Sequence, residues 1–99
     1  MSFTLVFNSA IESDLTDIYD YYELQLPGLG SDFLLSVEAT LNYIQREPLH
    51  FQKIYRNNRK ANLRRFPYGV FFLLSKETIY ILTVTHLTRN PKIWKSRKP

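Results

Sequence analysis

The 99-residue sequence predicts a single α+β domain, in which an antiparallel sheet packs on a helical hairpin and a short helical turn follows near the C-terminus. Residues 70–74, VFFLL, are apolar at every position, which is typical of a central strand covered on both faces. Two amphipathic segments separated by one Pro-Gly loop precede this strand. Stretches rich in β-branched and aromatic residues fill much of the chain after residue 50.

The chain opens with an alternating strand and a capped helix. Residues 2–7 place three apolar side chains on one face, and this strand can join the sheet at its edge or in its middle. Ser9 and Glu12 have the spacing of a capping box, which predicts a helix over about residues 10–25. The apolar stripe of this helix is Ile11, Leu15, Ile18, Tyr22 and Leu26. The tyrosines around it form either a binding surface or part of the core: Tyr19, Tyr21 and Tyr22.

A second helix follows almost at once. Residues 27–30, PGLG, end the first helix, and Ser31 or Gly30 can cap the second. Pro48 ends this second helix, whose apolar stripe is Phe33, Val37, Leu41 and Ile44. Because the connecting loop is so short, we expect the two helices to form an antiparallel hairpin.

Four strands and a last helical turn are predicted after this hairpin. The predicted strands are residues 51–56, 61–66, 70–74 and 79–85. A turn at residues 57–60 joins the first two strands, and a turn at residues 75–77 joins the last two as a β-hairpin. Pro67 forces a bend or bulge between the middle two strands. Asn90 and Pro91 have the residue types of a helix cap and a first helical position.

Charge is divided unevenly along the chain. The sequence has 13 Lys and Arg residues against 9 Asp and Glu, but residues 1–45 contain no Lys or Arg at all. This division favours a surface for a polyanion or an acidic partner on the second part of the chain. An acidic helical layer packed near a basic sheet would produce the same pattern.

Several classes of function are made unlikely by composition. The absence of cysteine removes disulfides and thiol catalysis, and it fits a reducing compartment. No apolar run is long enough to span a membrane and no secretory signal is visible, so we expect a cytoplasmic protein. His50 and His86 have no carboxylate at ligand spacing, so we expect no metal and no other cofactor.

The predicted β-hairpin brings basic residues to one edge of the sheet. Arg64 and Arg65 precede it and His86 and Arg89 follow it, so strand pairing would gather all four side chains. Metal-free RNA cleavage needs an acid, a base and cations around the phosphate, which His86 and the arginines can supply. Alternatively, the histidine caps backbone groups and the arginines pair with the acidic helices.

This interpretation defines two groups of candidate site residues. The candidate catalytic residues are His86, Arg65 and Arg89. In the second group, Tyr68 and Trp94 are candidates for stacking on a base. The candidate substrate-binding residues are Arg64, Tyr68, Trp94, Arg97 and Lys53.

Three stretches occur in a distinctive order: residues 13–22 (SDLTDIYDYY), 64–72 (RRFPYGVFF) and 81–89 (ILTVTHLTR). The motif Asn90-Pro-x-x-Trp94-x-x-Arg97 extends the last of them. Together they resemble the RelE/ParE family of bacterial type II toxin–antitoxin toxins. The resemblance covers nearly the whole chain, and it implies one RelE/ParE-like domain over residues 1–99.

The resemblance also implies a function. Such toxins, some of them plasmid stabilisation proteins, are neutralised by a cognate antitoxin, and operator DNA is bound only through the antitoxin complex. RelE-like members cut mRNA on the ribosome, whereas ParE-like members inhibit DNA gyrase without catalysis. Arg65 matches a third-strand arginine and His86 a fifth-strand histidine, while Trp94 stands where RelE-like members have a catalytic tyrosine. We expect ribosome-dependent mRNA cleavage, with gyrase inhibition or an inactive antitoxin-binding remnant as alternatives.

Overall fold

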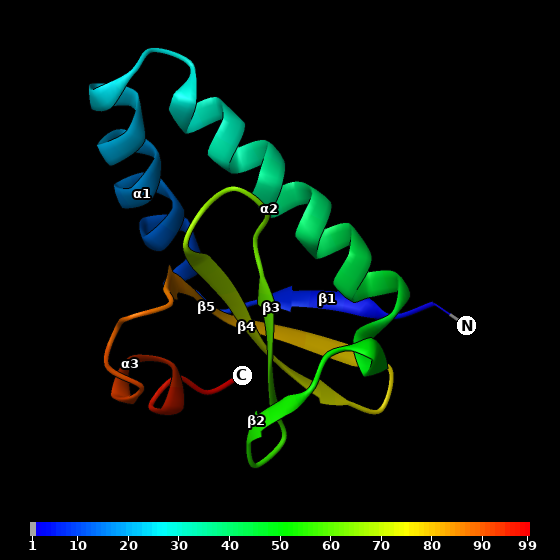
Figure 1. The fold of residues 1–99 in the computed structure, drawn as a ribbon. Coiled ribbons are helices and arrows are strands. Elements are labelled where there is room, and N and C mark those ends of the chain that lie inside the picture. Colours follow the sequence, from blue (N-terminus) through cyan, green and yellow to red (C-terminus); the bar gives the residue numbers. More distant parts are fainter. Residues whose placement is uncertain (1) are drawn as a thin grey trace.

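A computed structural model describes residues 2–99 and shows a helical hairpin lying across one mixed five-stranded sheet (Figure 1). The strand order is β1-β5-β4-β3-β2, with β1 parallel to β5 and all other neighbours antiparallel. The elements in chain order are β1 (Thr4–Phe7), α1 (Ile11–Gln25), α2 (Leu29–Arg46), the 3-10 turn η1 (Pro48–His50), β2 (Lys53–Tyr55), β3 (Asn58–Asn62), β4 (Tyr68–Ser75), β5 (Thr78–His86) and α3 (Lys92–Lys95). The predicted α+β class is confirmed, and the first strand joins the sheet at its edge.

The two faces of the sheet are covered by different parts of the chain. Phe72 points into the main core under α1 and α2, together with Phe33 and Ile44 from α2. The adjacent Phe71 points the opposite way, because successive strand residues alternate faces, and the ring of Trp94 stacks on it. The C-terminal segment therefore lies on the face away from the helices. Strand β4 is central and covered on both sides, as predicted.

The predicted helices are present, but both begin differently from the expectation. Ala10 precedes α1 and no side chain caps that helix, so the predicted capping box of Ser9 and Glu12 is wrong. Helix α2 begins at Leu29 after Gly28, which has a φ of +92°, rather than at a Gly30 or Ser31 cap. The stripe of α2 is confirmed. In α1, Leu26 falls outside the stripe because the helix ends at Gln25, and its side chain is 59% exposed.

The helical hairpin is closed by a side chain of α1. Glu23 Oε1 accepts hydrogen bonds from the backbone N–H groups of Gly28 and Gly30, both at 2.9 Å. The carboxylate thus satisfies donors at the start of α2 that have no partner within the helix. Gly30 is also the point of closest approach, because a Cβ there would lie 2.8 Å from both the ring and the carbonyl oxygen of Tyr19.

The third strand lies earlier in the chain than predicted. β3 covers Asn58–Asn62, so it overlaps the predicted strand at residues 61–66 only at residues 61–62. The turn before it lies at residues 56–57 and not at 57–60. Residues 63–67 form a loop instead, closed by a 2.9 Å hydrogen bond from the Leu63 N–H to the Tyr68 carbonyl. Arg65 has a φ of +72°, which extended strand backbone does not adopt. Arg64 and Arg65 therefore do not alternate across the sheet.

The tyrosines predicted as surface or core divide between the two. The Tyr22 ring packs against the rings of Phe33, Phe66 and Tyr68 at centroid distances of 5.0–6.1 Å. Tyr21 is more than half exposed.

Within the described residues 2–99, no helix is both long and apolar enough to cross a membrane.

Candidate functional site

The four residues predicted to share one edge of the sheet lie in two separate cavities. His86 and Arg89 line a cavity of about 290 Å³ between α1, the end of β5 and the C-terminal segment. Arg64 and Arg65 line another, of about 610 Å³, between α2 and the loop at residues 63–67. The 63–67 loop stays next to the end of β5, where the Leu87 N–H donates to the Pro67 carbonyl at 3.0 Å, but it turns the two arginines toward the cavity beside α2. There Arg65 lies 3.7 Å from the carboxylate of Asp32.

His86 is held in place by the turn that follows it. Its Nδ1 accepts a 3.1 Å hydrogen bond from the Thr88 backbone N–H and lies 2.8 Å from the Thr88 hydroxyl oxygen. Because the backbone donor fixes Nδ1 as an acceptor, the neutral ring carries its proton on Nε2. Neither nitrogen is then a free base. This geometry matches the alternative in which the histidine caps backbone groups.

The cavity beside His86 also contains a partly buried tyrosine. Tyr68 pairs with His86 across β4 and β5, and their rings meet edge to face at 5.2 Å. Burial raises the pKa of Tyr68, and the neighbouring Tyr21 raises it further, while the positive charge of Arg89 acts to lower it. Burial likewise raises the pKa of Tyr22, with Tyr68 adding to the effect. Both phenols are protonated at neutral pH and belong to the aromatic core.

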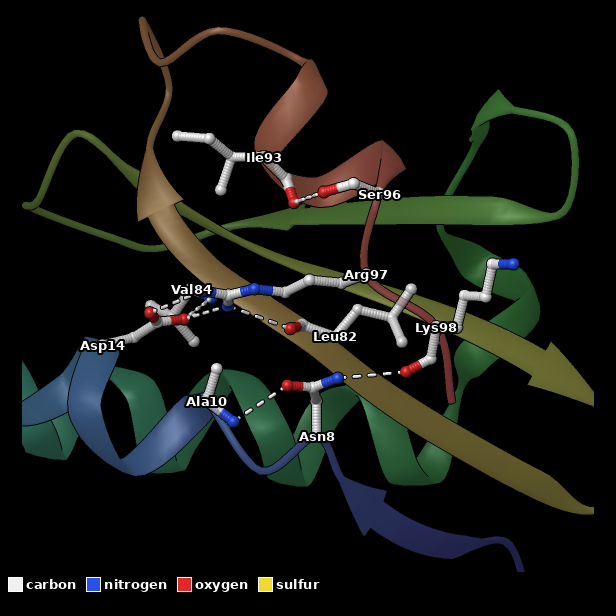
Figure 2. A network of polar contacts seen from close by, with 9 residues as sticks. All are labelled: Asn8, Ala10, Asp14, Leu82, Val84, Ile93, Ser96, Arg97 and Lys98. Carbon is white, nitrogen blue, oxygen red and sulfur yellow. Dashed lines mark hydrogen bonds and ion pairs between the residues drawn. The ribbon is translucent and has the colours of Figure 1, made fainter.

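Arg97 forms an ion pair with Asp14 of α1 (Figure 2). One guanidinium nitrogen donates to Asp14 Oδ1 at 3.0 Å, and the other donates to Asp14 Oδ2 and, at 3.2 Å, to the Leu82 carbonyl. Asp14 Oδ2 also accepts from the Val84 N–H at 3.3 Å. Since β1 pairs with β5 only as far as Ile81, these two side chains complete the edge of β5 beyond β1. The placement gives Arg97 a structural role, in contrast to the predicted substrate contact.

The other predicted substrate contacts are also dispersed. The indole of Trp94 is only 9% exposed and stacks on Phe71 at 4.9 Å, so the prediction that it stacks on a base does not fit its burial. Lys53 is exposed on β2, at the sheet edge farthest from β5 in pairing order, with two strands between them. Of the predicted substrate-binding residues, Tyr68 and Arg97 share a cavity with His86 and Arg89, and Arg97 is already paired with Asp14.

Sequence reasoning missed the acidic partners and one basic cavity. Asp14 pairs with Arg97, and Asp32 lies beside Arg65. The alternative of an acidic helical layer near basic residues anticipated such pairs without naming them. A third cavity, of about 330 Å³, lies between the β2–β3 turn and the C-terminal segment. Its cations are Arg56, Lys95, Arg97 and Lys98. The signal for it was the run of basic residues after Pro91, which is visible in the sequence.

Comparison with known proteins identifies the family. The sequence model of the family described as "ParE toxin of type II toxin-antitoxin system, parDE" matches residues 5–91. The chain belongs to this ParE toxin family. Toxin ParE2 of Mycobacterium tuberculosis, from strains CDC 1551 / Oshkosh and H37Rv, is 31% identical over 85 residues, covering 85% of this chain and 81% of the relative. The predicted RelE/ParE relationship is confirmed.

Two solved structures share the ParE-like fold. A chromosomal ParDE toxin–antitoxin system from P. aeruginosa matches with a TM-score of 0.75 and 19% identity, over 85% of this chain and 95% of that one. The RelBE2 toxin–antitoxin complex from Mycobacterium tuberculosis matches with a TM-score of 0.59 and 24% identity, over 87% and 99%. At these identities the likeness concerns the fold, and it confirms the expected arrangement of a helical hairpin on a sheet.

Proposed function

We propose that this ParE-family toxin acts in the cytoplasm and stops growth by binding DNA gyrase, without cutting RNA. The observation that carries the proposal is that the candidate catalytic residues line two different cavities. Arg65 lies beside Asp32 in one cavity, while His86 and Arg89 line another. A metal-free nuclease needs its acid, base and phosphate clamp around one phosphate. From the sequence alone, ribosome-dependent mRNA cleavage was expected and gyrase inhibition was the alternative; this proposal prefers gyrase inhibition.

One observation supports the second candidate, ribosome-dependent mRNA cleavage. His86, Arg89 and Tyr68 do share a cavity, and release of His86 from Thr88 would free one ring nitrogen. The two mechanisms make opposite predictions for a single substitution. Under the nuclease mechanism His86→Gln abolishes toxicity in a folded protein, whereas under the gyrase mechanism the folded variant stays toxic.

The deciding experiment is pulse labelling after induction of the toxin alone. Thymidine and amino-acid incorporation are followed side by side in cells expressing the wild type, His86→Gln or Arg65→Ala. We expect DNA synthesis to stop first and both variants to remain toxic, each with a cooperative melt. If protein synthesis stops first and the folded His86→Gln variant is harmless, the gyrase proposal is wrong. Folded wild-type protein without any effect on growth would identify an inactive remnant.

We also propose that a cognate antitoxin covers the cavity of about 610 Å³ between α2 and the loop at residues 63–67. Leu35 and Tyr43 contribute exposed apolar surface there. The basic side chains around them are Arg46, Arg64 and Arg65. An amphipathic segment with acidic residues at its margins complements this surface, in the manner of helices bound in apolar grooves.

The antitoxin surface can be tested with a substitution that leaves the core intact. Leu35 is 64% exposed, so Leu35→Glu should fold normally but lose rescue by a co-expressed cognate antitoxin. Leu24→Glu, at the exposed tip of the helical hairpin, is the matched control and should keep rescue. Equal rescue of both variants would place the antitoxin elsewhere.

A further inference from the structure

Most basic side chains of this protein have no acidic partner in the described residues 2–99. Two ion pairs occur there, and they use Arg65 and Arg97. The remaining lysines and arginines include Arg56, Lys95 and Lys98, which come from two distant parts of the chain. The fold gathers these three around the cavity between the β2–β3 turn and the C-terminal segment.

This cavity has a clear electrostatic character. No Asp or Glu side chain lines it, and the charge of its fourth cation, Arg97, is balanced by Asp14. Arg56, Lys95 and Lys98 are all exposed at its margin. Like charges held close together repel one another, and an anion that binds them reduces this repulsion. A ligand with several regularly spaced negative charges gains the most.

The aromatic residue in the cavity positions the cations and leaves little ring surface for a ligand. The Lys95 ammonium lies 4.3 Å from the centroid of the Tyr55 ring, and the Arg56 guanidinium lies 5.3 Å from it. The edge of the Trp94 indole also meets this ring, at 6.0 Å. Base stacking needs an open aromatic face, which Tyr55 does not offer. Of the apolar lining residues, Leu73 is half-buried, Leu82 is buried and Pro99 is exposed, so the cavity offers little exposed apolar surface for a lipid core.

We propose that the cluster of Arg56, Lys95 and Lys98 binds the phosphate backbone of duplex DNA without sequence preference. The choice of DNA over other polyanions rests on the proposed gyrase function, since gyrase holds duplex DNA while the toxin acts. Phosphate contacts fix a protein on a duplex without reading bases, and lysine and arginine are their usual donors. The face that carries the cluster is opposite the helical hairpin. The toxin can therefore contact DNA with one face and a protein with the other.

The test is fluorescence anisotropy of a labelled 20-base-pair duplex titrated with the purified toxin, without gyrase, at several salt concentrations. Three phosphate contacts give a slope of log K against log salt of about −2.7. The double variant Lys95→Gln/Lys98→Gln should reduce the magnitude of the slope by about one per lysine, for duplexes of any sequence. Two single variants that each remove one positive charge separate the effect of net charge from the effect of position. Lys98→Gln removes the charge from the cluster and should reduce the magnitude of the slope, whereas Arg46→Gln removes it from α2, in the opposite layer, and should keep the wild-type slope.

Each alternative outcome has a defined meaning. Equal losses for Arg46→Gln and for Lys98→Gln alone would overturn the proposal, because net charge rather than this cluster would then govern binding. Tighter binding to an RNA hairpin or to anionic lipid vesicles, at equal salt, would overturn the choice of DNA. A melting curve confirms that each variant is folded.

The DNA-binding proposal and the proposed gyrase function can fail independently of each other. Duplex binding that survives while the toxin fails to inhibit gyrase supercoiling would remove the gyrase target and leave the DNA surface intact. Inhibition of supercoiling by a toxin that binds no free duplex would have the opposite meaning and overturn the DNA surface.

Discussion

Asp14 and Arg97, near opposite ends of the chain, form a two-bond ion pair that completes the edge of β5 where β1 ends. Both side chains are mostly buried, at 16% and 22% exposed. Arg97 also donates to the Leu82 carbonyl and Asp14 accepts from the Val84 N–H. The pair therefore joins α1, β5 and the C-terminal segment into one unit.

Breaking this pair should destabilise the protein. Asp14→Asn leaves the Arg97 guanidinium poorly compensated and weakens an acceptor for the Val84 N–H. We expect a loss of about 2 kcal/mol in the free energy of unfolding, measured by urea denaturation, because a partly buried charge loses its partner.

The control for this prediction is Asp17→Asn, an exposed carboxylate one turn along the same helix, which should change stability little. Combining Asp14→Asn with Arg97→Gln should cost less than the two single changes added together. Strict additivity would show that the two side chains act independently.

The close approach of α1 and α2 gives a second prediction. Gly30→Ala would place a Cβ 2.8 Å from the Tyr19 carbonyl oxygen, which is backbone and cannot move aside easily. We expect a loss of about 2–3 kcal/mol in thermal or urea denaturation. Gly28→Ala has open space around the new Cβ but a φ of +92°, and should cost only about 1 kcal/mol. The reverse order would mean that the helices can separate at little cost.

Trp94 is the one tryptophan in the sequence, so the intrinsic tryptophan fluorescence of the protein measures the burial of this residue. Its fluorescence should be blue-shifted in the native protein and move to longer wavelength on unfolding, since the indole stacks on Phe71. Trp94→Ala should cost about 3 kcal/mol, and Trp94→Phe clearly less, because a second ring can still pack there. Strong quenching of native Trp94 by added RNA would instead support the stacking role predicted from the sequence.

The half-buried phenols of Tyr22 and Tyr68 predict a loss of stability at alkaline pH. Because burial raises the pKa of Tyr22 and Tyr68 in the folded state, the unfolded chain loses these protons first as the pH rises. The stability is fully present below the unfolded pKa of about 10 and falls above it. Urea midpoints measured between pH 8 and 11 should therefore fall more steeply for the wild type than for Tyr22→Phe. Parallel curves for the two proteins would contradict this assignment.

Periodicity allowed most of the fold to be predicted, and local rules failed where distant contacts decide. The stripe of α2 and the apolar run of β4 were correct because each depends on burial of a face by the whole domain. The start of α2 was missed because its donors are satisfied by Glu23, a side chain of the other helix. No pattern within the second helix contains that information.

The candidate site was predicted less well, and a single loop explains much of the error. Pairing of the two hairpin strands was expected to gather Arg65, which precedes the hairpin, and His86, which follows it, at one edge of the sheet. The positive φ of Arg65 instead turns the loop toward Asp32. A non-glycine residue in this conformation is uncommon and leaves little trace in sequence. His86 and Arg89 were brought together as expected because both follow the same strand.

The parallel pairing of β1 with β5 has a consequence for how the protein is made. Thr4 pairs with Thr78 and Phe7 with Ile81, so β1, the first strand synthesised, cannot pair until β5, the last strand, has been synthesised. Contacts between such distant segments form slowly, because a long loop of chain must close before they give any stabilisation. A nascent chain still on the ribosome lacks the strand that lies between β1 and β4. We therefore expect that a premature stop codon before residue 78 yields a fragment without an ordered sheet, and that the native fold appears only after most of the chain has been translated.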